Sequence, residues 1–143
     1  RAFDRFWVNH PDTWLIIIGG MGNLYTSTCE LAASVKSSSH IILIKYMSNP
    51  FPVVKACDFF LLSSYYEGQV PEADILGVPA AACDVNGARA FIRQYGGTLL
   101  PNSEDGLVQG MEMFVEGKIH TMHVDYEKRN QDILSKCEKL FME

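Results

Sequence analysis

The sequence predicts an α/β fold in which a parallel sheet is covered by helices on both faces. Short apolar runs rich in β-branched residues, too short for helices, alternate along the chain with segments of helical periodicity. Strands that alternate with helices imply right-handed crossovers and therefore a parallel sheet. We expect one Rossmann-like domain over residues 1–143, in which residues 124–143 form a C-terminal amphipathic helix.

The first half of the chain opens with a helix whose apolar residues share one face. Pro11 ends this helix, because proline disfavours helical backbone at the preceding residue. A buried strand then leads into the glycine-rich turn at 19–22, which begins the next helix. The expected elements of this half are helices over 2–7, 25–37 and 53–56 and strands over 14–18, 41–46 and 59–62.

The second half is marked by residues that begin and end helices. Pro71 suits the first position of a helix, where its missing N–H costs nothing, and Gly77 suits a left-handed helix end. Ser103, Glu104 and Asp105 place oxygens beside the unpaired N–H groups of a further helix. The expected elements are helices over 71–76, 86–95, 103–117 and 125–141 and strands over 79–83 and 98–100.

Composition and charge are those of an ordinary globular domain, with 48% hydrophobic and 20% charged residues and a formal net charge of -5. The 12 Lys and Arg residues are scattered, which disfavours a nucleic-acid partner, because phosphate binding needs a basic face. The sequence holds no signal peptide and no membrane-spanning run, so we expect a cytoplasmic protein. It begins inside a helical pattern without Met, from which we expect a fragment.

No metal centre is expected. The four histidines share no ligand spacing such as i, i+4 on one helix. The four cysteines share no metal-ligand or redox spacing, and we expect buried thiols in a reducing compartment. These residues are His10, His40, His120 and His123, and Cys29, Cys57, Cys83 and Cys137.

The candidate ligand site lies within residues 57–87, where polar residues gather at the junctions of strands and helices. Glu67 falls in a loop beyond the end of a strand, and Glu72 falls in the first turn of a helix. Either carboxylate could accept hydrogen bonds from a vicinal diol such as a ribose, or serve as a general acid or base. Alternatively, Glu72 complements the helix dipole and Glu67 is a solvated loop residue.

The residues around these glutamates could bind a diphosphate. Backbone N–H groups of Gly68 and Gln69 precede a helix N-terminus, which favours anions. Ser64 could donate a hydrogen bond to a phosphate or a sugar hydroxyl, or it could merely end the strand. Gly19 and Gly20 follow the first strand, but the dinucleotide pattern Gly-x-Gly-x-x-Gly is not completed, and NAD is therefore disfavoured.

Five segments together resemble the C-terminal, nucleotide-sugar-binding half of retaining GT-B glycosyltransferases of the large family 4 type. Their order along the chain is that of the family, and the resemblance runs from the first residues to about Gly117. Residues 49–52 (NPFP) together with YEGQ look most like the branch that acts on teichoic-acid or polyglycerol-phosphate polymers in bacteria. The matching segments are LIIIGG at 15–20, ACDFFLLSS at 56–64, YEGQ at 66–69, EADILGVP at 72–79 and DVNG at 84–87.

This resemblance implies an enzyme of the hexosyltransferase type that uses a UDP-sugar donor and needs neither a cofactor nor a metal. Glu67 would be the catalytic residue beside the transferred sugar, and no protein nucleophile is required. Glu72 would bind the ribose, and the backbone at Gly68 and Gln69 would meet the diphosphate. The remaining assignments are Gly19, Gly20 and Ser64 to donor binding and Lys45, Tyr46, Asn49 and Phe51 to the border of the base.

Two departures from the family pattern bear on activity. Three residues of the usual spacing between Glu67 and Glu72 are absent, which removes about 10 Å of extended chain from the diphosphate loop. An Arg and a Lys expected after the first strand of this half, and the whole N-terminal acceptor-binding half, are missing. We therefore expect no turnover by the fragment itself and, at most, peripheral membrane association of its parent protein.

Two alternatives remain. A catalytically inactive Rossmann-like fragment or binding module is favoured by the short Glu67–Glu72 spacing. A sugar-nucleotide 2-epimerase of the same architecture is disfavoured, because the YEGQ pattern belongs to the transferases.

Overall fold

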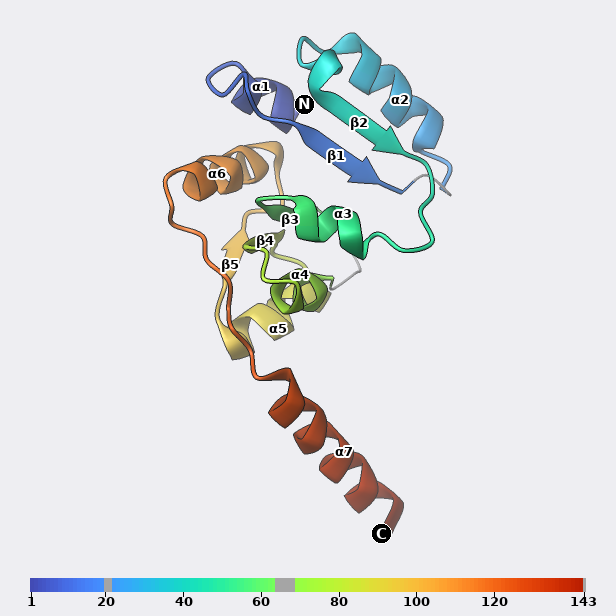
Figure 1. Cartoon of the computed structure of the whole chain (residues 1–143), viewed down its shortest axis with the longest axis vertical. Coiled ribbons are helices and arrows are strands. Elements are labelled where there is room, and N and C mark those ends of the chain that lie inside the picture. The colour runs from blue at the N-terminus through green and yellow to red at the C-terminus, as the bar shows by residue number, and fades with distance from the viewer. Residues whose placement is uncertain (20–21, 64–68, 143) are drawn as a thin grey trace.

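The computed structural model describes residues 1–19, 22–63 and 69–142, in which helices and strands alternate as predicted (Figure 1). The bounds of α5 and β5 are those expected from the sequence. The helices are α1 (Ala2–Trp7), α2 (Tyr25–Ser34), α3 (Phe51–Ala56), α4 (Val70–Ile75), α5 (Asn86–Tyr95), α6 (Glu104–Val115) and α7 (Tyr126–Met142), with a 3-10 turn at Ser38–His40. The strands are β1 (Leu15–Ile18), β2 (Ile41–Ile44), β3 (Phe60–Leu62), β4 (Ala80–Cys83) and β5 (Thr98–Leu100).

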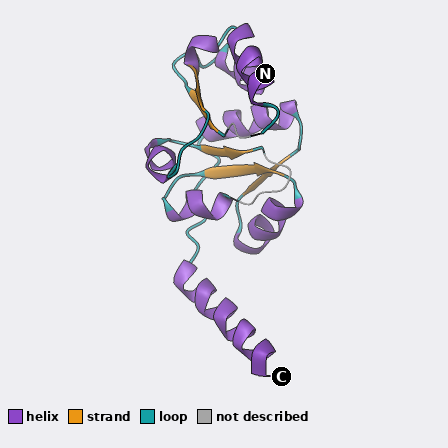
Figure 2. Ribbon diagram, turned by 90° about the vertical axis from the view of Figure 1, so that its right-hand side faces the viewer, coloured by secondary structure: helices purple, strands orange, loops and turns teal. Residues whose placement is uncertain are grey.

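Every strand pairing in the described residues is parallel, and helices lie on both sides of the strands (Figure 2). The predicted α/β architecture is therefore confirmed. The strands form two sheets, one in the order β1-β2 and the other in the order β3-β4-β5. The sequence did not indicate this division.

The core is built around β4, whose residues are buried on both faces. Ala80 and Ala82 face a cluster that includes Val70 of α4 and Ala88 of α5. Ala81 points the opposite way and packs in the cluster with Leu100, which also includes residues of α6. Because alternate residues of a strand point to opposite faces, the small side chains of β4 let helix layers approach from both sides.

Helices α1 and α6 form a layer that contacts both sheets. Phe3 and Phe6 of α1 pack against Met111 of α6, and Leu15 of β1 and Leu61 of β3 join the same cluster. The hydrophobic contacts of this layer therefore connect the two sheets, although no hydrogen bond between strands of different sheets joins them in the described residues.

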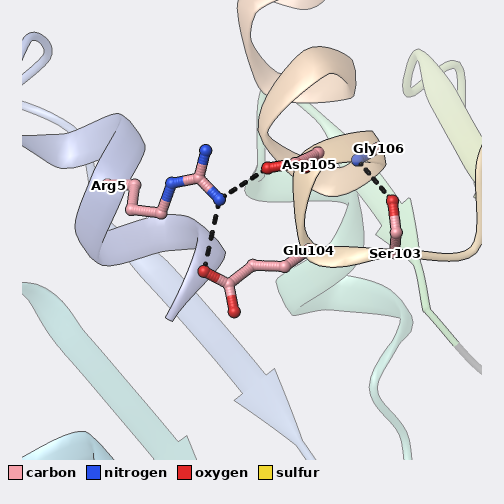
Figure 3. Close-up of polar contacts among 5 residues, drawn as sticks. All are labelled: Arg5, Ser103, Glu104, Asp105 and Gly106. Atoms are coloured by element: carbon pink, nitrogen blue, oxygen red, sulfur yellow. Dashed lines mark hydrogen bonds and ion pairs between the residues drawn. The ribbon is translucent and has the colours of Figure 1, made fainter.

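Polar contacts hold α1 to the start of α6 (Figure 3). One guanidinium nitrogen of Arg5 donates to Asp105 Oδ1 at 2.7 Å and to Glu104 Oε1 at 3.4 Å, which raises the pKa of Arg5. Ser103 caps α6 as predicted, because its Oγ accepts a hydrogen bond from the Gly106 N–H at 3.0 Å.

Helix α2 ends at Ser34, three residues before the predicted end. The backbone turns into extended conformation at Val35, and the Ser37 N–H then donates to Asp4 Oδ1 at 2.7 Å. This hydrogen bond lowers the pKa of Asp4. A carboxylate 33 residues earlier thus takes the N–H that a longer helix would have used.

Helix α7 extends away from the rest of the molecule in both views (Figure 1 and Figure 2). Its large apolar side chains Ile133, Leu134, Leu140 and Phe141 are exposed, Phe141 by 91%, whereas Tyr126 in the first turn is half-buried. Cys137 is exposed as well, so the expected burial of the thiols is wrong there, whereas Cys83 is buried and burial raises the pKa of its thiol. No helix in the described ranges has the length and apolarity needed to cross a membrane.

The facing edges of β1 and β3 lack strand partners in the described residues. The Gly19 N–H donates to Ile44 O, so the backbone groups of Ile16 and Ile18 point away from β2. The Phe60 N–H donates to Pro79 O, so those of Leu61 point away from β4. Each sheet therefore carries an edge with free donors and acceptors.

The two edges predict a pattern of amide exchange. We expect the amides of Ile16 and Leu61 to exchange with deuterium much faster than those of Ile17 and Phe60, which face paired strands. Exchange measured by NMR on the 143-residue chain checks this. Equal protection of both sets would mean that these edges are paired in solution.

Gly106 predicts a sharp steric constraint on α6. A Cβ added there would lie 2.0 Å from the carbonyl oxygen of Pro101, so the backbone itself must move. We expect Gly106→Ala to lower the free energy of unfolding by about 1–3 kcal/mol in urea denaturation. Gln109→Ala, on the exposed side of the same helix, is the control and should change it by less than about 0.5 kcal/mol.

Candidate functional site

Part of the predicted donor site lies outside the described residues. Gly20, Ser64, Glu67 and Gly68 belong to this part. Their assigned roles, including that of Glu67 as the catalytic residue, stay predictions. The described part of the site consists of the start of α4, the ends of β1 and β2, and the start of α3.

Helix α4 places Gln69 and Glu72 at its N-terminus. Gln69 is exposed and precedes the helix, and Pro71 occupies the second helical position, one residue later than predicted. Val70 and Ala73 are fully buried and fasten the first turn to the core. Glu72 therefore projects from a turn whose position is set by packing.

One oxygen of the Glu72 carboxylate lacks a hydrogen-bond partner in the described residues. Its Oε2 is buried and has no hydrogen-bond partner among residues 1–19, 22–63 and 69–142. Most buried polar atoms are hydrogen-bonded, and an unpaired charged one costs free energy. A ligand that donates a hydrogen bond, such as a sugar hydroxyl, would supply what this oxygen lacks.

The predicted base-binding residues follow β2. Gly19 has φ 140°, and its N–H donates to Ile44 O at 3.0 Å, which places it beside Lys45. Tyr46 is 67% exposed. Lys45 Nζ lies 5.6 Å from the centre of the Tyr25 ring, a cation–π contact that the sequence did not reveal.

Asn49 and Phe51 lie at the start of α3. The Asn49 side-chain oxygen accepts a hydrogen bond from the Phe51 N–H at 3.2 Å and so holds the turn into the helix. Phe51 is 48% exposed. Helix α3 packs beside α4, which brings the helix of Phe51 next to the helix of Glu72. Lys45 and Tyr46 follow β2, a strand of the other sheet.

A pocket of about 390 Å³ opens where β3 and β5 end. Ser63 lines it and directly precedes the residues that are not described, so it adjoins the predicted donor loop. Arg1 and Glu104 both line it, so its polar lining carries charges of both signs beside the hydroxyl of Ser103. The sequence had assigned Ser103 and Glu104 only to the helix start. The lining residues are Arg1, Ala2, Leu31, Ser63, Asn102, Ser103, Glu104 and Leu107.

Asp74 makes the densest set of polar contacts in the described chain. Its Oδ1 accepts hydrogen bonds from the Met122 and His123 N–H groups at 2.6 and 3.1 Å, and its Oδ2 accepts one from the Val124 N–H at 3.2 Å. The Tyr126 hydroxyl lies 3.1 Å from Oδ2. We call these contacts the Asp74 network. The sequence indicated no role for Asp74, because its partners lie 48 to 52 residues away.

Arg89 is not free to bind an anion. It donates hydrogen bonds to the carboxylate and the carbonyl oxygen of Asp84 and to the Asn86 side chain. Its charge is therefore used within the turn that begins α5. In the described part of the chain, no three His, Cys, Asp or Glu side chains come together as a metal site would require.

Comparison with known proteins identifies a matching family. A family model described as glycosyl transferases group 1 matches residues 1–131. The chain is 32% identical over 87 residues to an uncharacterized glycosyltransferase, MJ1059, of Methanocaldococcus jannaschii, a match that covers 59% of this chain and 21% of that protein.

Two solved structures share the fold. The pneumococcal O-GlcNAc transferase GtfA, in complex with UDP and GlcNAc, superposes with a TM-score of 0.72 at 23% identity and covers 97% of this chain. A provisionally named UDP-N-acetylglucosamine 2-epimerase of Listeria monocytogenes has a TM-score of 0.62 at 17% identity over 80% of the chain. This chain spans 31% of the length of each structure and 21% of MJ1059.

Tyr126 predicts a pH dependence of stability. Burial, and then the hydrogen bond to Asp74, raise the pKa of its phenol, so the folded state holds the proton more tightly than the unfolded state does. This stabilisation is complete below about pH 10, the ordinary value for tyrosine, and is lost as the pH rises beyond it. We expect the free energy of unfolding to fall progressively as the pH rises above about 10, and to fall less steeply in Tyr126→Phe. Parallel slopes in urea denaturation would contradict the assignment.

Proposed function

Because the chain belongs to the group 1 glycosyl transferases, we propose that it forms the nucleotide-sugar-binding half of a GT-B enzyme. That enzyme transfers a hexosyl group from a UDP-sugar, with retention of configuration, to a glycan or cell-envelope polymer. A polymer of the teichoic-acid or polyglycerol-phosphate type is the acceptor that the NPFP and YEGQ segments favour. The observation that carries the binding role is the buried, unpaired oxygen of Glu72.

In this proposal Glu72 accepts hydrogen bonds from the ribose hydroxyls of the donor. A vicinal diol offers two donors to one carboxylate, and charge-assisted hydrogen bonds of this kind are among the stronger ones. The backbone at Gln69, at the start of α4, meets the diphosphate together with Gly68 and Ser64. Glu67 lies beside the transferred sugar. The diphosphate itself assists its own departure, so no protein nucleophile, cofactor or metal takes part.

In this proposal the uracil base lies between the end of β2 and the start of α3. The exposed rings of Tyr46 and Phe51 offer apolar surface to a base, and Lys45 supplies a positive charge near the nucleotide. The presence of UDP and GlcNAc in the GtfA complex, a protein of the same fold, supports a UDP-sugar as the donor.

The remainder of the parent protein completes the site. The unpaired edges of β1 and β3 suit a further parallel strand between the two sheets, and the far greater length of the relatives leaves room for it. By its resemblance to the family, that strand precedes the Arg and Lys that bind the diphosphate, and an N-terminal domain binds the acceptor. The 143-residue chain alone then binds donor without turnover. The parent is cytoplasmic, with at most peripheral membrane association.

A second candidate is a catalytically inactive Rossmann-like binding module. The observation in its favour is the short spacing between Glu67 and Glu72, which leaves Gly68, Gln69, Val70 and Pro71 to surround a diphosphate. In that case Glu72 serves the helix dipole, and its replacement leaves any ligand response unchanged.

Replacing Glu72 separates these candidates. We expect UDP to shift the NMR signals of Gln69, Val70 and Glu72, and Glu72→Gln to weaken UDP binding about ten-fold, the loss of one hydrogen bond to a charged group. We also expect Glu72→Gln to unfold at a higher temperature, because it replaces a carboxylate that has a buried oxygen without a partner in the described residues by a neutral amide.

Glu138→Gln, which removes an equal charge from exposed α7, is the matched control and should change neither measurement. A Glu72→Gln protein that binds UDP as the parent does and is less stable would support the dipole role instead. If millimolar UDP shifted none of these NMR signals, the proposal that this chain binds the donor would be wrong.

A further inference from the structure

Asp74 is buried, with 7% of its surface exposed, and every described contact of its carboxylate is with a donor far along the chain. The three backbone donors are 48 to 50 residues away, and the Tyr126 hydroxyl is 52 residues away. A buried carboxylate with several backbone donors is well satisfied, and removing it leaves those N–H groups without a partner.

The Asp74 network joins α4 to the segment that leads into α7. Within this segment His123 has φ 54°, a left-handed conformation that a residue other than glycine adopts at a cost. The His123 N–H is one of the groups that Asp74 holds. The Tyr126 hydroxyl also lies 3.1 Å from the Pro71 carbonyl oxygen, so Tyr126 contacts both turns of α4.

The position of α4 depends on its contacts with the rest of the protein. Helix α4 has six residues, too few for independent stability. Val70 and Ala73 seat one side of it in the core, and Asp74 fastens another side to the segment 122–126. Glu72 belongs to the same six-residue helix, so a shift of α4 moves its carboxylate.

We propose that Asp74 is a positioning residue for the donor site: through the Asp74 network it fixes α4, and thereby the Glu72 carboxylate, against the segment that begins α7. This rests on the proposed function, because Glu72 is the residue that it positions. The network also makes the coupling reciprocal, since a ligand bound at Glu72 stabilises the arrangement of segment 122–126 by the same factor as that arrangement strengthens binding.

Contacts of α7 add to this connection. The guanidinium carbon of Arg129 lies 5.8 Å from the centre of the Phe91 ring and 6.0 Å from that of Tyr95, both on α5. The first turns of α7 are thus held by α4 through Tyr126 and by α5 through Arg129. Beyond them the described part of α7 is exposed. The connection between α4 and α7 therefore depends on segment 122–126.

The test measures UDP affinity of the 143-residue chain, by NMR titration at a temperature where every variant is folded. We expect Asp74→Asn to weaken UDP binding about five-fold and Tyr126→Phe to weaken it less, because it removes one contact of the network. Asp4→Asn is the matched control: it also removes a carboxylate that accepts a backbone N–H, from Ser37, and should leave UDP affinity unchanged.

Two further measurements separate positioning from mere stabilisation. In a Glu72→Gln background, Asp74→Asn should have no further effect on UDP affinity, because the residue through which it acts is gone. In the parent chain, UDP should slow deuterium exchange of the Met122, His123 and Val124 amides. A residue that only stabilised the fold would change UDP affinity equally with and without Glu72, and UDP would protect these three amides no more than other amides of the core.

The outcomes are distinct. If the parent chain and Asp74→Asn bind UDP equally well, the positioning role is wrong and the donor site stands. The same holds if Asp74→Asn weakens UDP binding as much in the Glu72→Gln background as in the parent chain. If the parent chain does not bind UDP, the proposed function fails and the positioning role fails with it. If Asp74→Asn does not fold, Tyr126→Phe decides by the same two comparisons.

Discussion

Burial of β4 on both faces is the constraint on which the rest of the molecule depends. A strand that is packed on one side by α4 and α5 and on the other by α6 needs small side chains, and Ala80, Ala81 and Ala82 supply them. The same packing decides where the candidate site can be. Val70 and Ala73 reach the core from the first turn of α4, and Glu72, between them in the sequence, is carried to the edge of that core.

The other sheet lacks this constraint. Every residue of β1 is only half-buried, although an apolar strand of this kind is usually buried on both faces when it lies inside a parallel sheet. One described neighbour, β2, and one helix layer, α1 with α6, do not suffice to cover it. The molecule therefore has a tightly packed part around β4 and an open part around β1, and the proposed donor residues are divided between them.

How much could be read from the sequence follows from the range of the interactions. The bounds of α5, the helix end at Gly77 and the cap at Ser103 were predicted correctly, because residues within a few positions determine them. The end of α2 was wrong because Asp4, 33 residues away, binds Ser37. The candidate site shows the same limit. Glu72 was found from its place before a helix, but neither its unpaired oxygen nor the contacts of Asp74 has a local signal.

Glu72 and Asp74 stand two residues apart in one short helix and have opposite environments. The acceptors of Asp74 are filled by four donors of the protein, so this carboxylate contributes to the fold and is unavailable to a ligand. One oxygen of Glu72 is buried and has no donor among the described residues, an arrangement that costs stability unless another group donates to it. The asymmetry supports the proposed donor site, because an acceptor that is already desolvated and unpaired in the free protein loses little when a ligand donates a hydrogen bond to it.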